Sequence, residues 1–144
     1  MCIRDRANAY LAFHEDKYDK VTNLLIDFKS SLPFLNIQAR TLTTRAYFEA
    51  FMIDDSYYDM FLANLEAFNK YLYRSKELTQ HKIKSFQNYI YFLRQLGKFQ
   101  IENRGSENAL NQLLVEIKNT QPINASSWFI NRIDKMVQSS KHSY

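Results

Sequence analysis

The sequence predicts an all-α protein, and three observations lead to this prediction. The 144 residues include only two glycines and two prolines, too few for the turns that a sheet of several strands requires. Apolar residues make up 46% of the chain, enough to form a core. Between Phe34 and Phe99 they recur every three or four positions, the spacing of a helix that buries one face. We therefore expect about seven helices.

The N-terminal third predicts two short helices, over about residues 7–16 and 18–29, and then a long one. The break falls before Pro33, because proline fits the first turn of a helix and disfavours helix in the residue before it. The third helix should run from Pro33 to about Ile53. Its expected buried stripe contains Phe34, Ile37, Thr41, Thr44, Phe48 and Phe51.

The middle of the chain predicts a fourth and a fifth helix. Asp54 or Asp55 can cap the fourth, since a carboxylate suits a helix N-terminus. Thr79 is the expected N-cap of the fifth, which should run to about Ile101. Leu78 and Ile83 flank Thr79 at the two positions of a hydrophobic staple. Both helices therefore carry start signals.

The C-terminal part predicts two more helices and a tail. Gly105 and Ser106 interrupt the pattern before a sixth helix, and Pro122 ends the connection after it. Asn124 should cap the seventh helix, which we expect to end near residue 138. Residues 139–144 are polar and should form a frayed tail.

The first six residues resemble a known artefact. The transposon end used to build sequencing libraries translates as Met-Cys-Ile-Arg-Asp followed by Arg or Ser, and residues 1–6 match it in order. We therefore expect residues 1–6 to be non-native adapter translation, and the natural protein to extend upstream. On this interpretation Cys2, the single cysteine, is not native, and the helical domain covers residues 7–138.

A weak internal repeat relates two parts of the chain. The segment Ala9–Phe13 is similar to Ala46–Phe51, and each is followed by an acidic turn and a tyrosine that opens the next helix. A helix pair that repeats at roughly 34 residues is the tetratricopeptide signature. From about Ala7 to Val137 the chain resembles the C-terminal part of a bacterial tetratricopeptide-like helical-repeat protein of uncharacterised function. The usual glycine of the first helix is absent, and the third and fifth helices are longer than the repeat allows.

This resemblance implies antiparallel helix pairs stacked as the end of a right-handed solenoid, with a protein or peptide bound on a concave surface. Polar residues on the outer side of the last helix fit a terminal cap. The alternative is a compact helical bundle. The resemblance brings no catalytic residue and no cofactor.

The sequence contains no recognisable catalytic or metal-binding motif. Its three histidines, His14, His81 and His142, lie far apart, and one cysteine cannot form a disulfide or a cysteine zinc cluster. No phosphate-binding glycine loop or calcium loop occurs. We therefore expect no enzyme activity in this segment, and no metal or cofactor.

Basic residues gather on one face of the predicted fifth helix. The members of this face are Lys84, Tyr91, Arg94 and Lys98. Cations beside an aromatic ring could meet phosphates and stack on bases, which makes nucleic-acid binding an alternative function. The plainer interpretation is a solvated outer face that complements the acidic segment between Glu49 and Glu66.

Three functions remain open from the sequence. The first is a non-enzymatic scaffold that binds a protein or peptide, and the second is nucleic-acid binding through the fifth helix. The third is a purely structural end of a larger protein whose activity lies upstream. No apolar run reaches the roughly 20 residues of a membrane helix, and we expect a cytoplasmic location.

Overall fold

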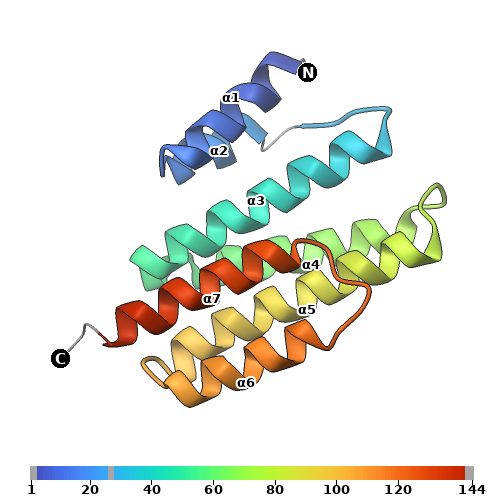
Figure 1. Cartoon of the computed structure of the whole chain (residues 1–144). Helices are drawn as coiled ribbons and strands as arrows, with labels where there is room; N and C mark the ends of the chain where they lie inside the picture. The colour runs from blue at the N-terminus through green and yellow to red at the C-terminus, as the bar shows by residue number, and fades with distance from the viewer. Residues whose placement is uncertain (1–2, 26–27, 142–144) are drawn as a thin grey trace. The chain divides into compact units, whose positions relative to one another are not determined.

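The structure, a computed structural model, describes residues 3–25 and 28–141, and this part of the chain is helical with no strand (Figure 1). The prediction of an all-α fold with seven helices is confirmed. The helices are α1 (Ile3–His14), α2 (Tyr18–Leu25), α3 (Pro33–Ile53), α4 (Tyr58–Arg74), α5 (Gln80–Glu102), α6 (Glu107–Lys118) and α7 (Ser126–Lys141). A short 3-10 helix, η1 (Asp55–Tyr57), precedes α4.

The helices gather into two compact units. Unit 1 is Met1–Glu77 and holds α1 to α4, and unit 2 is Leu78–Tyr144 and holds α5 to α7. The division falls in the connection between α4 and α5. A single repeat domain over residues 7–138 stays a prediction.

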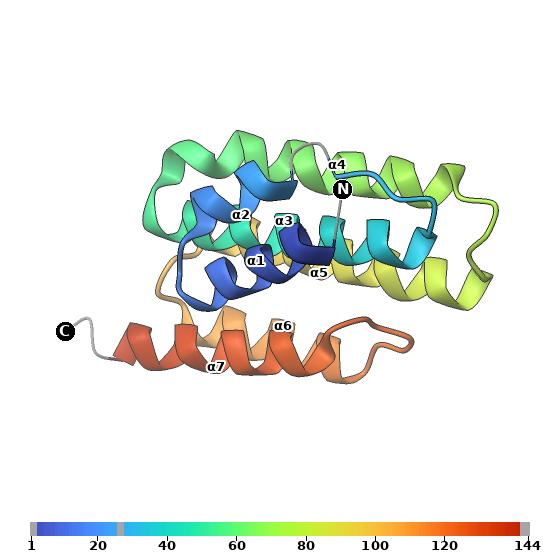
Figure 2. The same cartoon turned by 90° about the horizontal axis from the view of Figure 1, so that it is seen from above.

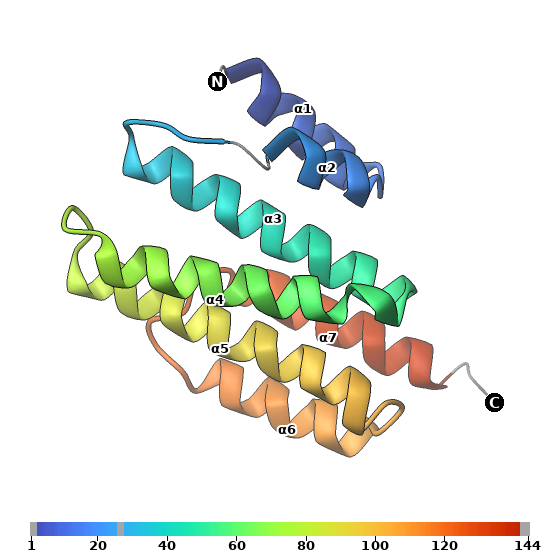
Figure 3. The same cartoon turned by 180° about the vertical axis from the view of Figure 1, so that it is seen from behind.

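Unit 1 consists of two successive antiparallel helix pairs. α1 packs on α2 and α3 packs on α4, while α3 also contacts both helices of the first pair. Within this unit α1 and α3 form one layer, and α2 and α4 form the other (Figures 2 and 3). The core between the pairs is built largely from small residues, which let the helices approach closely: Ala9, Ala12, Val21, Leu25, Ala39, Leu42 and Ala46.

The centre of unit 1 is α3, which buries residues on most of its circumference. Pro33 occupies its first turn, as predicted. Phe48 and Phe51 are fully buried and lie 5.7 Å and 5.9 Å, centroid to centroid, from the ring of Phe61. Phe34, however, is 63% exposed, so its place in the buried stripe was wrong. Because α3 is buried on several sides, a single stripe does not describe which of its residues face the core.

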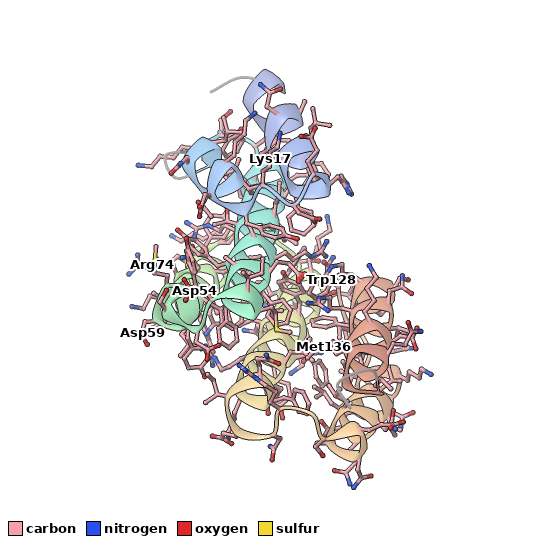
Figure 4. The ribbon with its side chains drawn as sticks, turned by 90° about the vertical axis from the view of Figure 1, so that its left-hand side faces the viewer. Lys17, Asp54, Asp59, Arg74, Trp128 and Met136 are labelled. Atoms are coloured by element: carbon pink, nitrogen blue, oxygen red, sulfur yellow. The ribbon has the colours of Figure 1, made fainter. Side chains whose placement is uncertain are left out.

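The turn between α3 and α4 is held by side-chain hydrogen bonds. Asp54 Oδ1 accepts from the backbone N–H of Ser56 at 3.0 Å, so Asp54 caps η1. The predicted cap therefore exists one short helix earlier, since α4 itself begins after Tyr57 without a side-chain cap. The Tyr57 hydroxyl donates to Asp19 Oδ1 at 3.0 Å and joins this turn to α2. Figure 4 shows Asp54 and Asp59 at the surface of unit 1.

Unit 2 begins with the predicted cap. Thr79 Oγ1 accepts from the N–H of Lys82 at 3.2 Å at the start of α5, and Ser106 caps α6 in the same way. α6 packs on α7 as well as on α5. The rings of Tyr89 and Phe92 on α5 lie 5.7 Å and 6.3 Å from the ring of Phe129 on α7. These contacts form the aromatic core of this unit.

The last connection differs slightly from the prediction. The backbone N–H of Phe129 donates to the carbonyl of Ala125, and α7 begins at Ser126. A cap at Asn124 would require the helix to begin one residue earlier, at Ala125. The N–H of Asn124 donates instead to the Ser85 carbonyl on α5, at 3.2 Å. α7 continues to Lys141, into the segment expected to be a frayed tail, and residues 142–144 lie outside the described residues. None of the helices in the described ranges is both long and apolar enough to cross a lipid bilayer.

Candidate functional site

A groove in unit 1 is the strongest candidate for a binding site. Its volume is about 590 Å³, and α3, which contributes more lining residues than any other segment, forms its floor. The walls come from α2, from the connection after it and from α4. The groove is defined by residues of four segments: Thr22 and Leu25, then Phe28, Lys29 and Ser30, then Asn36, Ala39, Arg40, Thr43, Thr44 and Tyr47, then Asn64 and Tyr71.

Arg40 and Tyr71 are paired across two helices inside the groove. The guanidinium carbon of Arg40 on α3 lies 4.6 Å from the ring centroid of Tyr71 on α4. A cation over an aromatic face is attracted by the ring quadrupole. Partial burial lowers the pKa of Arg40 from its usual value, but a guanidinium remains protonated at neutral pH. The groove therefore contains a positive charge in a fixed place.

The rim of the groove beside α2 is held by a reciprocal pair of hydrogen bonds. The backbone N–H of Ser30 donates to Asn36 Oδ1, and Asn36 Nδ2 donates to the Ser30 carbonyl, both at 2.8 Å. Asn36 belongs to the first turn of α3, so it fixes the preceding connection onto the start of this helix. Lys29 lies next to this clamp, and the rim thus carries a second cation.

Other polar groups of the groove are partly satisfied within their own helices. The Thr43 hydroxyl donates to the Ala39 carbonyl at 2.7 Å, and Asn64 Nδ2 donates to the Met60 carbonyl at 2.9 Å. These bonds use donors and leave lone pairs on the two side-chain oxygens. The oxygens can therefore accept hydrogen bonds from a bound molecule.

The charge of the lining residues that the structure describes is one-sided. These residues include two cations, Lys29 and Arg40, and no aspartate or glutamate. They also include no histidine or cysteine. Within the described ranges, no three histidine, cysteine, aspartate or glutamate side chains gather into a metal site. The geometry is suited to binding an anion together with hydrogen-bonding groups.

The second candidate is the basic face predicted from the sequence, here called the α5 face. The structure places Lys84, Tyr91, Arg94 and Lys98 on α5, and all four are exposed, Tyr91 by 49%. Their spacing of seven, three and four positions puts them on one side of the helix. For the three cations of this face, no ion pair is recorded within the part of the chain that the structure describes.

Sequence reasoning found the α5 face and missed the groove. The groove brings together Arg40 and Tyr71 from the successive helices α3 and α4, and no local pattern indicates which side chains of two paired helices meet. One signal was present: Arg40 lies within the predicted third helix, close to Ala39 and Leu42, which are both buried. A cation at such a position needs a partner or an opening to solvent.

Comparison of the chain with protein-family models, with curated proteins and with solved structures found no match in any of the three.

Proposed function

We propose that this chain is a non-enzymatic interaction module that binds a peptide segment of a protein partner. The observation that carries the proposal is the groove, which combines apolar side chains, hydrogen-bonding oxygens and a fixed cation on one floor helix. Its volume of about 590 Å³ falls in the range of sites that enclose small ligands or short peptide segments. Tyrosine and arginine are also the residues most enriched at energetically important interface positions.

The repeat architecture is part of the same proposal. Two successive antiparallel pairs with α1 packed on α3 agree with a tetratricopeptide-like stack in unit 1. We extend this to the whole chain as the end of a solenoid of helix pairs. Such stacks offer extended surfaces on which peptides are bound. The groove, however, has walls from α2 and α4, so the proposed peptide meets the second helix of each pair as well as α3.

The proposal is tested by selecting peptides from a random display library with the full chain as bait. Binding of the selected peptides would then be measured by isothermal titration calorimetry. Asn64→Trp should block the groove, whereas Ala63→Trp places the same side chain on the adjacent, exposed position of α4 outside the groove. We expect Asn64→Trp to abolish binding and Ala63→Trp to leave it unchanged. A library that yields no binding peptide would contradict the proposal.

Nucleic-acid binding through the α5 face is the second candidate. The exposure of Lys84, Arg94 and Lys98 without a recorded ion pair favours it. Its test is fluorescence anisotropy with labelled single-stranded RNA and DNA over a series of salt concentrations. Binding through phosphates should weaken steeply with salt, and the combined variant K84E/R94E/K98E should remove it. Nucleic-acid binding that changes neither with the salt concentration nor with the triple substitution would exclude the α5 face as the site.

A further inference from the structure

We infer that the groove recognises an acidic side chain of the bound peptide, with Arg40 as the residue that receives its carboxylate. This inference rests on the proposed function, because it specifies the chemistry of the peptide. The observations behind it are the one-sided charge of the described lining residues and the contact between the guanidinium and the Tyr71 ring.

Charge complementarity gives the sign of the ligand. Arg40 is partly buried, and its described surroundings supply no carboxylate to neutralise it; the group that acts on it most directly is the Tyr71 ring. A charge held away from bulk water interacts more strongly with an opposite charge than one in solvent does. Lys29 on the rim adds a second positive charge. An anionic group is therefore the favoured occupant beside Arg40.

The geometry of the Arg40–Tyr71 pair favours a planar carboxylate over an anion of another shape. The guanidinium carbon of Arg40 lies over the face of the Tyr71 ring, 4.6 Å from its centroid. This contact is made with the ring face and not with a hydrogen-bond acceptor of a side chain, so N–H groups of the guanidinium stay available to a ligand. Two parallel N–H groups match the two oxygens of a carboxylate in a bidentate pair. Tyr71 therefore prepares Arg40 for this contact and limits its rotation.

The remaining lining points to a peptide as the source of that carboxylate. The side-chain oxygens of Thr43 and Asn64 keep lone pairs that can accept the N–H groups of a peptide backbone. A nucleic acid would instead require a track of cations, because proteins that bind it neutralise several phosphates. Among its described lining residues the groove supplies two cations only. A peptide segment with an aspartate or glutamate side chain fits these two cations and the free lone pairs of the lining oxygens.

The first test uses the unmodified chain. Peptides selected from the random library should be enriched in aspartate or glutamate at one position. A synthetic copy in which that acid is replaced by its amide should bind about tenfold more weakly, since a charge-assisted pair becomes a neutral one. This comparison needs no variant of the chain and so does not depend on whether a variant folds.

The second test assigns the acid to Arg40. Arg40→Gln should weaken the acidic peptide about tenfold and should bind the amide peptide as the unmodified chain does. Arg40→Lys keeps the charge but loses the planar fork, and should restore only part of the affinity. Arg74→Gln makes the same charge change at an exposed position of α4 outside the groove and should have no effect. Circular dichroism of each variant checks its fold.

The outcomes separate the two proposals. Selected peptides without an acidic position would overturn this inference and leave peptide binding intact, whereas a library without any binder would overturn both. An acidic peptide that binds Arg40→Gln and the unmodified chain equally well would show that Arg40 does not receive its carboxylate, and would overturn the inference. Binding of labelled RNA or DNA that is lost in Arg40→Gln would assign the groove to nucleic acid and overturn the inference.

Discussion

The groove and the α5 face both present cations beside a tyrosine, but they hold them differently. In the groove, Arg40 is partly buried and its guanidinium lies against a ring supplied by another helix. On the α5 face, Lys84, Arg94 and Lys98 stand exposed along one helix. The first arrangement depends on how three helices pack, and the second depends only on helical spacing. A packed site can select the shape of a ligand, whereas an exposed row of charges selects mainly its sign.

The largest expected effect comes from removing aromatic packing between α3 and α4, the two helices that carry Arg40 and Tyr71. Phe48 on α3 is fully buried against Phe61, so Phe48→Ala should lower the free energy of unfolding by about 3–5 kcal/mol and weaken peptide binding. Phe34→Ala is the matched control on the same helix, because Phe34 is 63% exposed. This variant should change the free energy of unfolding by less than about 0.5 kcal/mol. Urea denaturation followed by circular dichroism measures both. If Phe48→Ala and Phe34→Ala lose the same free energy of unfolding, the contact between Phe48 and Phe61 does not stabilise this unit.

A smaller effect is expected from removing the ring that holds Arg40. Tyr71→Ala should lower the free energy of unfolding by about 1 kcal/mol through the lost cation–π contact, and should weaken binding of an acidic peptide. Tyr73→Ala on the same helix is the control, since Tyr73 is 75% exposed and lies outside the groove. Calorimetric titration of both variants sharpens the comparison. If Tyr71→Ala and Tyr73→Ala bind the acidic peptide with the same affinity, the Tyr71 ring does not position Arg40.

Charge reversal on the α5 face should have little effect on stability. The side chains of Lys84, Arg94 and Lys98 are exposed, so each change to glutamate should alter the free energy of unfolding by less than about 0.5 kcal/mol. Binding of an acidic peptide by the groove should survive in K84E/R94E/K98E. Thermal denaturation and peptide titration of this variant measure both quantities. Loss of peptide binding would place the peptide on the α5 face.

The smallest effect is a pH dependence at the turn beside α2. The hydrogen bond to Asp19 raises the pKa of Tyr57 above its unfolded value. This bond therefore adds stability below the unfolded pKa of tyrosine, and the contribution is lost as the pH rises through the higher folded pKa. Tyr57→Phe should be slightly less stable at neutral pH and should lose stability less steeply in alkali. The free energy of unfolding would be measured against pH for Tyr57→Phe and for the unmodified chain. Equal slopes in alkali would show that Tyr57 does not cause the pH dependence.

Local signals in the sequence predicted the helices well. Pro33 marks the start of α3, and Thr79 caps α5 by accepting from Lys82, because these effects act within one turn of the chain. Phe34 was misplaced because a helix that is buried on several sides has no single apolar stripe. The cap at Asp54 was displaced by a short 3-10 helix, whose formation depends on how the turn packs.

The groove could not be predicted in the same way. Its floor and walls come from three helices and a connection, and their adjacency is a tertiary property. The sequence showed an arginine within the predicted third helix, but it did not show that its guanidinium would lie over the Tyr71 ring. The α5 face was visible because all of its members share one helix and one period.

The short length of α2 has a consequence for how a partner would influence this protein. A helix of eight residues is marginal by itself and depends on the surfaces against which it packs. α2 rests on α1 and α3, and its Thr22 and Leu25 also form a wall of the groove. A bound peptide would therefore stabilise α2 by mass action, in proportion to the logarithm of its concentration. The abundance of the partner would then set how often α2 opens to proteases and to hydrogen exchange.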